Sequence, residues 1–216
     1  MEIDNFFIMD TNRDLIDELI RTGYLKSERL IRAFEKVDRK DFVPLEFMAE
    51  AYGNYPLAIG YGQTISQPAT VAFMLEKLQP ELGDKVLDVG CGSGWQTALL
   101  AELIGPTGRI VGIEIKDNLV ILGNQNLKKY NYQNAKIIKG NGWQGLPETA
   151  PFAKIIVAAA AEKIPKALAE QLEIGGRLVI PVGKGQQDIV VVDRIDESHF
   201  KEQHYPGFIF VPLVEH

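Results

Sequence analysis

The feature that constrains the fold most is a glycine-dense stretch directly after a short hydrophobic run. Residues 86–89 read Val-Leu-Asp-Val, residues 90–94 read Gly-Cys-Gly-Ser-Gly, and an apolar segment at helical spacing begins at Trp95. Such glycines let the backbone turn tightly and let a ligand approach where a Cβ atom would block it. A strand, a glycine loop and a helix in this order are typical of cofactor sites in α/β proteins. The stretch therefore predicts a sheet with a cofactor at its edge.

Strand and helix patterns alternate from this loop onward. Helices are predicted at 95–104, 118–130 and 165–172, and Gly175-Gly176 is expected to close the last of them. The predicted strands that alternate with them are 86–89, 109–115, 135–139, 153–159 and 177–181. This order predicts a parallel sheet covered on both faces. Two later strands, 188–193 and 208–213, have no helix between them and predict an antiparallel pair at the sheet edge.

The first eighty residues differ from the rest. Thr11 or Asn12 can cap one helix and Ser27 a second, while Pro68 favours the first position of a third. Between them, residues 52–67 are dotted with glycine and show no clear periodicity. We expect a single domain over 1–216. Its expected parts are N-terminal helices with a substrate-side segment at 1–80, a cofactor-binding core at 81–183 and C-terminal edge strands at 184–216.

Composition argues against several classes of protein. The chain has 23 basic and 29 acidic residues, a net charge of −6 that disfavours non-specific nucleic-acid binding. A single cysteine, Cys91, leaves no intrachain disulfide and fits a reducing compartment. No signal peptide and no stretch near the roughly 18 apolar residues of a membrane helix are visible. We therefore expect a cytoplasmic monomer with no metal site and no nucleic-acid or membrane partner.

The glycine loop also indicates which cofactor binds. A dinucleotide fingerprint requires its third glycine five residues after the first, a position that Trp95 occupies here. Asp88, just before the loop, would repel the phosphates of a dinucleotide and attract the positive ammonium and sulfonium of S-adenosylmethionine. The loop therefore favours the methyl donor, and a dehydrogenase is the disfavoured alternative.

Two polar residues follow later strands. Glu114 ends the predicted second strand, where a carboxylate can accept both ribose hydroxyls; the alternative is a solvated acid at a strand end. Asn141 lies in the Gly140–Trp143 loop, where its side-chain carbonyl suits an adenine amino group. The alternative for Asn141 is an asparagine that serves a turn. Trp143 either stacks on adenine or packs in the core.

Five segments carry a resemblance to a known family. The most diagnostic one is 59–68, Ile-Gly-Tyr-Gly-Gln-Thr-Ile-Ser-Gln-Pro. The others are 37–44, 142–145, 175–178 with 181–183, and 210–213. Through them the chain resembles the protein-L-isoaspartate O-methyltransferases nearly end to end. The resemblance implies an α/β fold of the class I S-adenosylmethionine-dependent methyltransferase (Rossmann-like) type. Its sheet would be seven-stranded and mostly parallel, with an antiparallel C-terminal edge pair, and N-terminal helical additions would cover the active site.

The resemblance also implies a reaction and a site. A methyl group passes from S-adenosyl-L-methionine to the free α-carboxylate of L-isoaspartyl residues in damaged proteins or peptides, leaving S-adenosyl-L-homocysteine. Ser66 matches the family's active-site serine. Loop chemistry and resemblance together give the expected cofactor-binding residues Gln63, Thr64, Ile65, Asp88, Gly90, Cys91, Gly92, Ser93, Gly94, Glu114, Asn141 and Gly142. Cys91 is interpreted as a small packing residue, with a nucleophile as the alternative.

Some positions depart from the family pattern. Asn141 and Asn54 stand where aspartate is usual, Ala58 where proline is common, and Ala161-Glu162 where alanine-proline is expected. These departures keep open a carboxyl methyltransferase with a different acceptor. A non-catalytic binding protein that keeps the fold is the second alternative.

The implied chemistry needs little from the protein. An α-carboxylate has a pKa of roughly 3.5, so it is an anion at neutral pH and attacks the sulfonium methyl without a general base. The three histidines all lie in the tail, in keeping with this. We expect the Ser66 hydroxyl to orient the acceptor, assisted by N–H groups at the start of the Pro68 helix. The alternative is that Ser66 only caps that helix.

Overall fold

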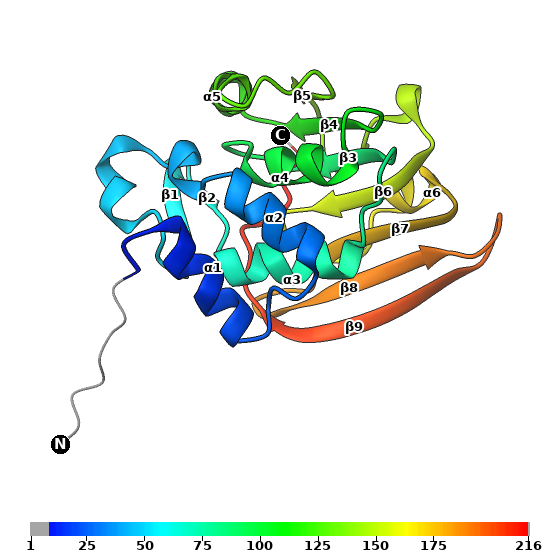
Figure 1. The fold of residues 1–216 in the computed structure, drawn as a ribbon. Coiled ribbons are helices and arrows are strands. Elements are labelled where there is room, and N and C mark those ends of the chain that lie inside the picture. Colours follow the sequence, from blue (N-terminus) through cyan, green and yellow to red (C-terminus); the bar gives the residue numbers. More distant parts are fainter. Residues whose placement is uncertain (1–8, 216) are drawn as a thin grey trace.

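The structure, a computed structural model that describes residues 9–215, is built around a seven-stranded sheet (Figure 1). Its spatial order is β5-β4-β3-β6-β7-β8-β9. The strands are β3 (Lys85–Val89), β4 (Arg109–Glu114), β5 (Ala135–Lys139), β6 (Phe152–Val157), β7 (Leu172–Val182), β8 (Gln187–Arg194) and β9 (Phe200–Phe208). The first five in spatial order run parallel, and β8 and β9 are antiparallel. The predicted sheet architecture is confirmed.

Helices cover both faces of this sheet. They are α1 (Asn12–Arg21), α2 (Glu28–Lys36), α3 (Pro68–Leu78), α4 (Trp95–Ile104), α5 (Asp117–Lys128) and α6 (Lys166–Glu170). The first five share one buried apolar cluster, and α6 belongs to the other. Within β3, Val86 faces the first cluster and Leu87 the second, which explains why this strand is continuously hydrophobic. In Figure 1, α3 and α4 lie in front of the sheet and α6 behind it.

The N-terminal helices begin where the sequence places them. Thr11 forms a capping box with Asp14: the Asp14 amide donates to the Thr11 hydroxyl at 3.1 Å, and the Thr11 amide donates to the Asp14 carboxylate at 2.9 Å. Helix α2 starts after Ser27, although the Ser27 side chain makes no capping bond. Pro68 occupies the first turn of α3, as predicted. Two short 3₁₀ segments, Arg39–Phe42 and Leu45–Glu50, connect α2 to the next region.

A small hairpin lies in the region without clear periodicity. It consists of β1 (Leu57–Gly60) and β2 (Gln63–Ile65), which pair antiparallel. Its two turn residues, Tyr61 (φ 56°) and Gly62 (φ 73°), are both left-handed, as the twist of a tight hairpin requires. Tyrosine is an uncommon residue in that conformation, so the turn has no clear sequence signature.

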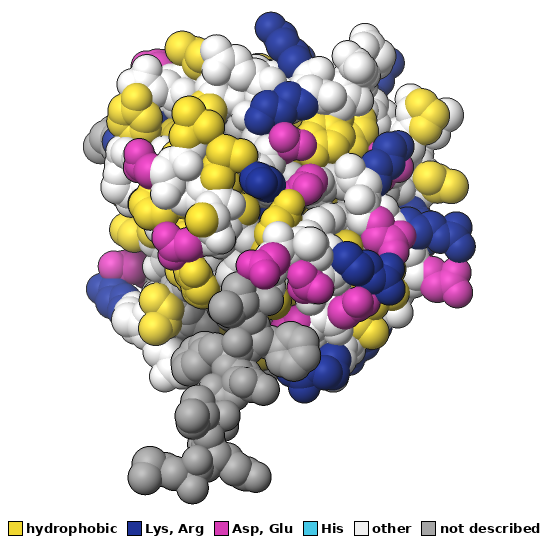
Figure 2. Space-filling model, turned by 60° about the vertical axis from the view of Figure 1, so that its left-hand side comes forward, with side chains coloured by type: hydrophobic (Ala, Val, Ile, Leu, Met, Phe, Trp, Pro, Cys, Tyr) yellow, Lys and Arg dark blue, Asp and Glu magenta, His cyan; other side chains and the backbone are white. Residues whose placement is uncertain are grey.

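The face of the molecule in Figure 2 shows acidic and basic side chains interspersed. The N-terminal helices carry ion pairs, among them Arg32–Glu28 within α2 and Lys36 of α2 with Glu102 of α4. On this face, basic side chains do not gather into a patch of their own. No helix among residues 9–215 is both long and apolar enough to span a bilayer.

Two predictions for the C-terminal half are wrong. Gly175-Gly176 does not close a helix, because α6 ends at Glu170 and both glycines lie inside β7. The last strand is 200–208 rather than 208–213. Residues 201–204 of β9 are all solvent-exposed, since this part of the edge strand lies outside the core, and their polar sequence hides the strand. Part of the charged stretch 193–202 therefore belongs to β9.

Residues 209–214, here called the C-terminal strap, fold back onto the sheet instead. The Ala160 amide donates to the Val211 carbonyl at 2.8 Å, and the Leu213 amide donates to the Ala160 carbonyl at 2.7 Å. The Trp143 indole N–H donates to the Leu213 carbonyl at 3.1 Å. Figure 1 shows this red segment running from β9 to the ends of β3 and β4. Of the apolar residues that suggested a strand, Phe210, Val211 and Leu213 are half-buried in this arrangement, whereas Ile209 is exposed.

Candidate active site

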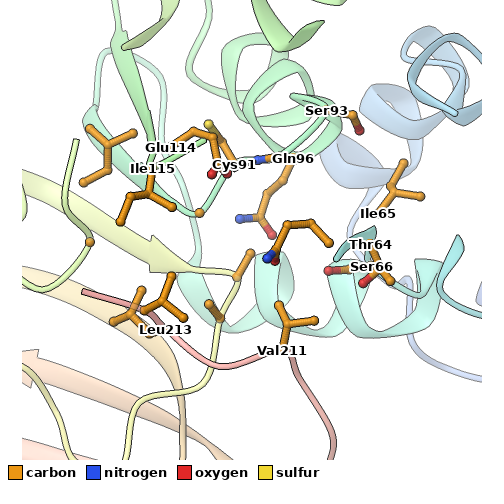
Figure 3. A pocket seen from close by; sticks show the side chains of 18 of the residues that line it. Thr64, Ile65, Ser66, Cys91, Ser93, Gln96, Glu114, Ile115, Val211 and Leu213 are labelled. Carbon is orange, nitrogen blue, oxygen red and sulfur yellow. Dashed lines mark hydrogen bonds between the residues drawn. The ribbon is translucent and has the colours of Figure 1, made fainter. Parts of the chain in front are cut away.

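A cavity that opens to solvent lies at the carboxyl ends of β3, β4 and β6 (Figure 3). The chain leaves β3 for β4 on one side and returns to β6 on the other, the point where open α/β sheets bind ligands. Three segments far apart in the sequence supply most of its walls, namely 63–66, 90–96 and 211–214. The cavity is therefore assembled by the tertiary fold rather than by one local motif.

The glycine loop forms the floor of the cavity. Gly90 (φ 74°) and Gly92 (φ 52°) are left-handed and line it, as do Cys91 and Ser93. A Cβ atom on Gly92 would lie 3.0 Å from the Ile59 side chain, which packs over the loop. The glycines thus leave room that larger residues would fill. A cofactor that needs close backbone approach fits this floor.

Gly94 serves a different purpose from the other loop glycines. It is left-handed (φ 89°) and precedes α4, and it is not among the residues that line the cavity. A Cβ atom there would lie 3.3 Å from the Gly123 carbonyl oxygen of α5. Gly94 therefore allows α4 and α5 to pack closely.

Glu114 stands at the end of β4 and lines the cavity, as the sequence predicts. Its side chain is 5% exposed, and its two carboxylate oxygens accept from the amides of Gly92 and Lys116, each at 3.0 Å. Each oxygen keeps a second lone pair for a further donor. This fixed, acceptor-only group suits the vicinal hydroxyls of a ribose. The alternative of a solvated acid does not agree with its burial.

Asp88 is fully buried and does not line the cavity. Its carboxylate accepts from the Gln96 amide at 2.8 Å and from the Thr97 hydroxyl at 2.6 Å. Burial raises the pKa of Asp88 to about 6, although these two hydrogen bonds oppose the rise. Gln96 does line the cavity, so the charge of Asp88 reaches a ligand through a neighbour rather than by the direct contact expected for it.

The Asn141 side chain stabilises a turn, which is the alternative that the sequence left open beside adenine binding. Its carbonyl oxygen accepts from the Trp143 amide at 2.9 Å, and its amide group donates to the Glu215 carbonyl at 3.1 Å. Its neighbours Gly140 and Gly142 line the cavity, whereas Asn141 does not. The asparagine that replaces an aspartate therefore holds residues near the C-terminal strap, using an N–H group that aspartate lacks.

Cys91 lines the cavity but is shielded, with 6% of its surface exposed. It packs against β4, where a Cβ atom on Gly112 would lie 2.9 Å from its sulfur. Burial, with the nearby Asp88 and Glu114, raises the pKa of the Cys91 thiol well above its usual range. A neutral, packed thiol agrees with the interpretation of Cys91 as a packing residue.

The substrate-side segment forms the wall opposite Glu114. Gln63, Thr64, Ile65 and Ser66 all line the cavity, and Figure 3 shows Thr64 and Ser66 across it from Glu114. The structure thus brings the predicted active-site serine and the predicted cofactor loop to one cavity.

Ser66 is not the cap of α3. The N-cap position is Gln67, and the Asn54 side-chain oxygen accepts from the Ala69 amide at 3.0 Å. Asn54, another departure from the family pattern, therefore caps the helix from a distance. The predicted help from N–H groups at the helix start is reduced for the same reason, because Pro68 has none and Ala69 already donates to Asn54.

Sequence reasoning missed part of the cavity wall. Val71, Gln96 and the pair Ala158-Ala159 line it, and so do Val211 to Val214. Pro212 was the available signal, because proline within an apolar run argues against a strand. No sequence pattern indicated that residues 211–214 form a wall of the cavity at the carboxyl ends of β3, β4 and β6.

Comparison with known proteins agrees with this geometry. The model of the family "Protein-L-isoaspartate(D-aspartate) O-methyltransferase (PCMT)" matches residues 10–216. A protein-L-isoaspartate O-methyltransferase of Methanothermobacter thermautotrophicus is 43% identical over 96% of each chain. One of Aeropyrum pernix is 44% identical over 93% of this chain and 78% of its own.

Solved structures show the same likeness. A Plasmodium falciparum protein described as a protein-L-isoaspartate O-methyltransferase was crystallised with S-adenosyl-L-homocysteine. It superposes with a TM-score of 0.87 at 25% identity, covering 95% of this chain and 99% of its own. Because the family model matches residues 10–216 and a relative is 43% identical over 96% of each chain, this chain belongs to the protein-L-isoaspartate(D-aspartate) O-methyltransferase family.

Proposed function

We propose that this protein transfers the methyl group of S-adenosyl-L-methionine to the free α-carboxylate of L-isoaspartyl residues in proteins or peptides, and that Ser66 orients the acceptor. The observation that carries the proposal is the meeting of two motifs in one cavity. The substrate-side segment 63–66 faces the glycine loop and Glu114 across it. Family membership supplies the reaction, and the cavity supplies a place for both reactants.

The donor set fits the methyl donor. Glu114 would hold the ribose hydroxyls, and Gly90 and Gly92 would admit the rest of the molecule to the floor. The neighbouring carboxylate of Asp88, held by Gln96, favours a cationic ligand. Bound there, S-adenosylmethionine supplies a methyl group activated by a positively charged sulfonium.

The acceptor needs orientation more than proton transfer. Its carboxylate is ionised at neutral pH, and among the described residues no lysine, arginine or histidine lines the cavity. A cation in direct contact would weaken the nucleophile, whereas a hydroxyl can donate one hydrogen bond and leave the second oxygen free. Ser66 is in position for this role, with its hydroxyl free of helix capping. The reacting atoms must approach to about 3–3.5 Å in line, which rewards a fixed wall.

A paired assay tests this function. Labelled methyl transfer is measured on an isoaspartyl peptide and on its aspartyl twin, and base-labile release of the label identifies an ester. We expect transfer to the isoaspartyl peptide alone. Transfer to both peptides would indicate another acceptor, and binding of donor without turnover would indicate a binding protein. Either outcome would refute the proposal.

The role of Ser66 is tested in the same assay. At saturating donor, Ser66→Ala is expected to lower kcat about tenfold or more, because hydrogen bonds to charged groups contribute roughly 1.5–3 kcal/mol. The affinity for S-adenosylhomocysteine should stay within twofold. Ser198→Ala, at an exposed serine in the β8–β9 turn, is the matched control. Unchanged turnover in Ser66→Ala would remove the serine from the mechanism. Monomeric assembly, cytoplasmic location and the absence of nucleic-acid and membrane partners stay predictions from the sequence.

A further inference from the structure

The buried side chain of Arg39 forms hydrogen bonds with several main-chain carbonyls in and before the substrate-side segment. Arg39 is fully buried, and its Nη1 donates to the carbonyls of Ala51 at 2.7 Å and Gly53 at 3.0 Å. Its Nη2 donates to the carbonyls of Tyr55 at 3.0 Å and Ser66 at 3.2 Å. A single side chain therefore ties four points of residues 51–66 together, and the last of them is the residue assigned to the acceptor.

The environment of Arg39 is unusual for a charge. Among residues 9–215 no carboxylate lies within ion-pair distance of it, and its Nε is buried without a hydrogen-bond partner. Burial lowers the pKa of Arg39 to about 10, so the guanidinium is still charged at neutral pH. A buried charge without a counter-ion costs the fold stability, and simple packing gives no reason to keep it. A position of this kind calls for a functional explanation.

The geometry suits arginine and no other residue. The planar guanidinium presents its N–H donors in a rigid fork, so one side chain reaches carbonyls on both terminal nitrogens. Charge-assisted hydrogen bonds of this kind are stronger than those between neutral groups. The guanidinium also lies over the indole of Trp95, 5.5 Å from its ring centre. Because Trp95 lines the cavity from the first turn of α4, Arg39 contacts both the substrate-side wall and the cofactor side.

We propose that Arg39 is a positioning residue for methyl transfer, which fixes the main chain at Ser66 relative to the cofactor wall through its four carbonyl contacts and Trp95. This inference rests on the proposed function for its kinetic consequence. Arg39 itself does not line the cavity, so it acts through Ser66 and leaves the acceptor carboxylate free of a direct cation. The hairpin of β1 and β2 lies between two of the contacts, at Tyr55 and Ser66, so its placement depends on the same side chain.

The test variant is Arg39→Lys, which keeps the charge and loses the fork. At saturating donor and peptide, we expect kcat on the isoaspartyl peptide to fall about tenfold while the dissociation constant of S-adenosylhomocysteine stays within twofold. Arg32→Lys is the matched control, because Arg32 is an exposed arginine of α2 paired with Glu28, and it should change neither quantity. An Arg39→Lys variant with unchanged kcat, or one that loses S-adenosylhomocysteine binding as well, would overturn the proposal.

A double-mutant cycle separates positioning from a general structural role. If Arg39 acts through Ser66, Arg39→Lys combined with Ser66→Ala should turn over no more slowly than Ser66→Ala alone. Rates that fall by the product of the two single effects would show that Arg39 acts independently, and would also overturn the proposal.

Hydrogen exchange gives a measurement that does not depend on activity. In Arg39→Lys, amide exchange should quicken within 51–66 and stay unchanged in β3. Unchanged exchange in 51–66 would contradict the positioning role. If the wild-type protein fails to methylate isoaspartyl peptides, the proposed function fails, while this exchange pattern still reports whether Arg39 holds the segment.

Discussion

The buried carboxylate of Asp88 allows a quantitative prediction. Its pKa rises from an ordinary 3.8 to about 6 in the folded protein, chiefly because of burial. The folded state therefore holds the Asp88 proton more tightly than the unfolded state does. The stability that comes from the neutral carboxyl is fully present below pH 3.8 and is lost as the pH rises through 6. The contribution of Asp88 to the free energy of unfolding is therefore smaller at neutral pH than at low pH.

The perturbation is Asp88→Asn, which stays neutral at every pH. An asparagine keeps an oxygen to accept from Gln96, and its amide can donate to the Thr97 hydroxyl, so the local packing is preserved. Each pKa unit is worth about 1.36 kcal/mol. Integrated over the titration, the free energy of unfolding of wild type relative to Asp88→Asn should fall by about 2 kcal/mol between pH 4.5 and pH 7.5.

The assay is urea unfolding of both proteins at four pH values across that window, at constant ionic strength. The comparison is the difference between the two unfolding free energies, because every other titrating group cancels in it. We expect the difference to change with pH in favour of Asp88→Asn and to level off above about pH 7. Two unfolding profiles that run parallel from pH 4.5 to 7.5 would refute the reasoning, since Asp88 would then titrate alike in the folded and unfolded states.

Two further predictions concern the cavity wall. Glu114→Gln replaces an acceptor that two amides already use, so calorimetry should show affinity for S-adenosylhomocysteine at least about tenfold weaker. Asp117→Asn, at an exposed carboxylate paired with Lys139, is its control, and equal losses in both variants would argue against a specific contact. Gly142→Ala places a Cβ atom 2.6 Å from Leu213 and 2.8 Å from Val89, and overpacking of this kind costs about 1–3 kcal/mol. The Tm of Gly142→Ala should drop, and amide exchange in the C-terminal strap should quicken. Adding Leu213→Ala to the same chain should restore part of the lost Tm. A Gly142→Ala variant with the wild-type Tm would contradict the close contact between Gly142 and Leu213.

The cofactor half of the fold was predictable because its signals are local. Helix α4 occupies the predicted residues 95–104, and β5 the predicted 135–139. The glycines before Trp95 mark the start of α4, and apolar residues bounded by polar ones mark β5, so both elements can be located from the sequence itself. Glu114 was predictable for the same reason, since a strand end and its facing loop follow from the order of elements.

The rest depended on contacts between distant residues. The four carbonyls that bind Arg39 lie 12 to 27 positions away, and nothing in the sequence marks a carbonyl as an acceptor. Asn54 caps α3 from 15 positions away. The strand β9 is polar because most of it is exposed at the sheet edge, whereas Val211 and Leu213 of the strap are half-buried and line the cavity. In both places, burial set by the tertiary fold decided the residue types, and local periodicity alone pointed the wrong way.

The walls of the cavity come from the first third, the middle and the end of the chain, and this has a consequence for the stability of the fold. A ligand that occupies it contacts all three regions, so it binds the folded chain and not the unfolded one. By mass action, a ligand at a hundred times its dissociation constant raises the free energy of unfolding by about 2.7 kcal/mol. Bound S-adenosyl-L-methionine is therefore expected to stabilise the fold of the enzyme as well as to supply the methyl group.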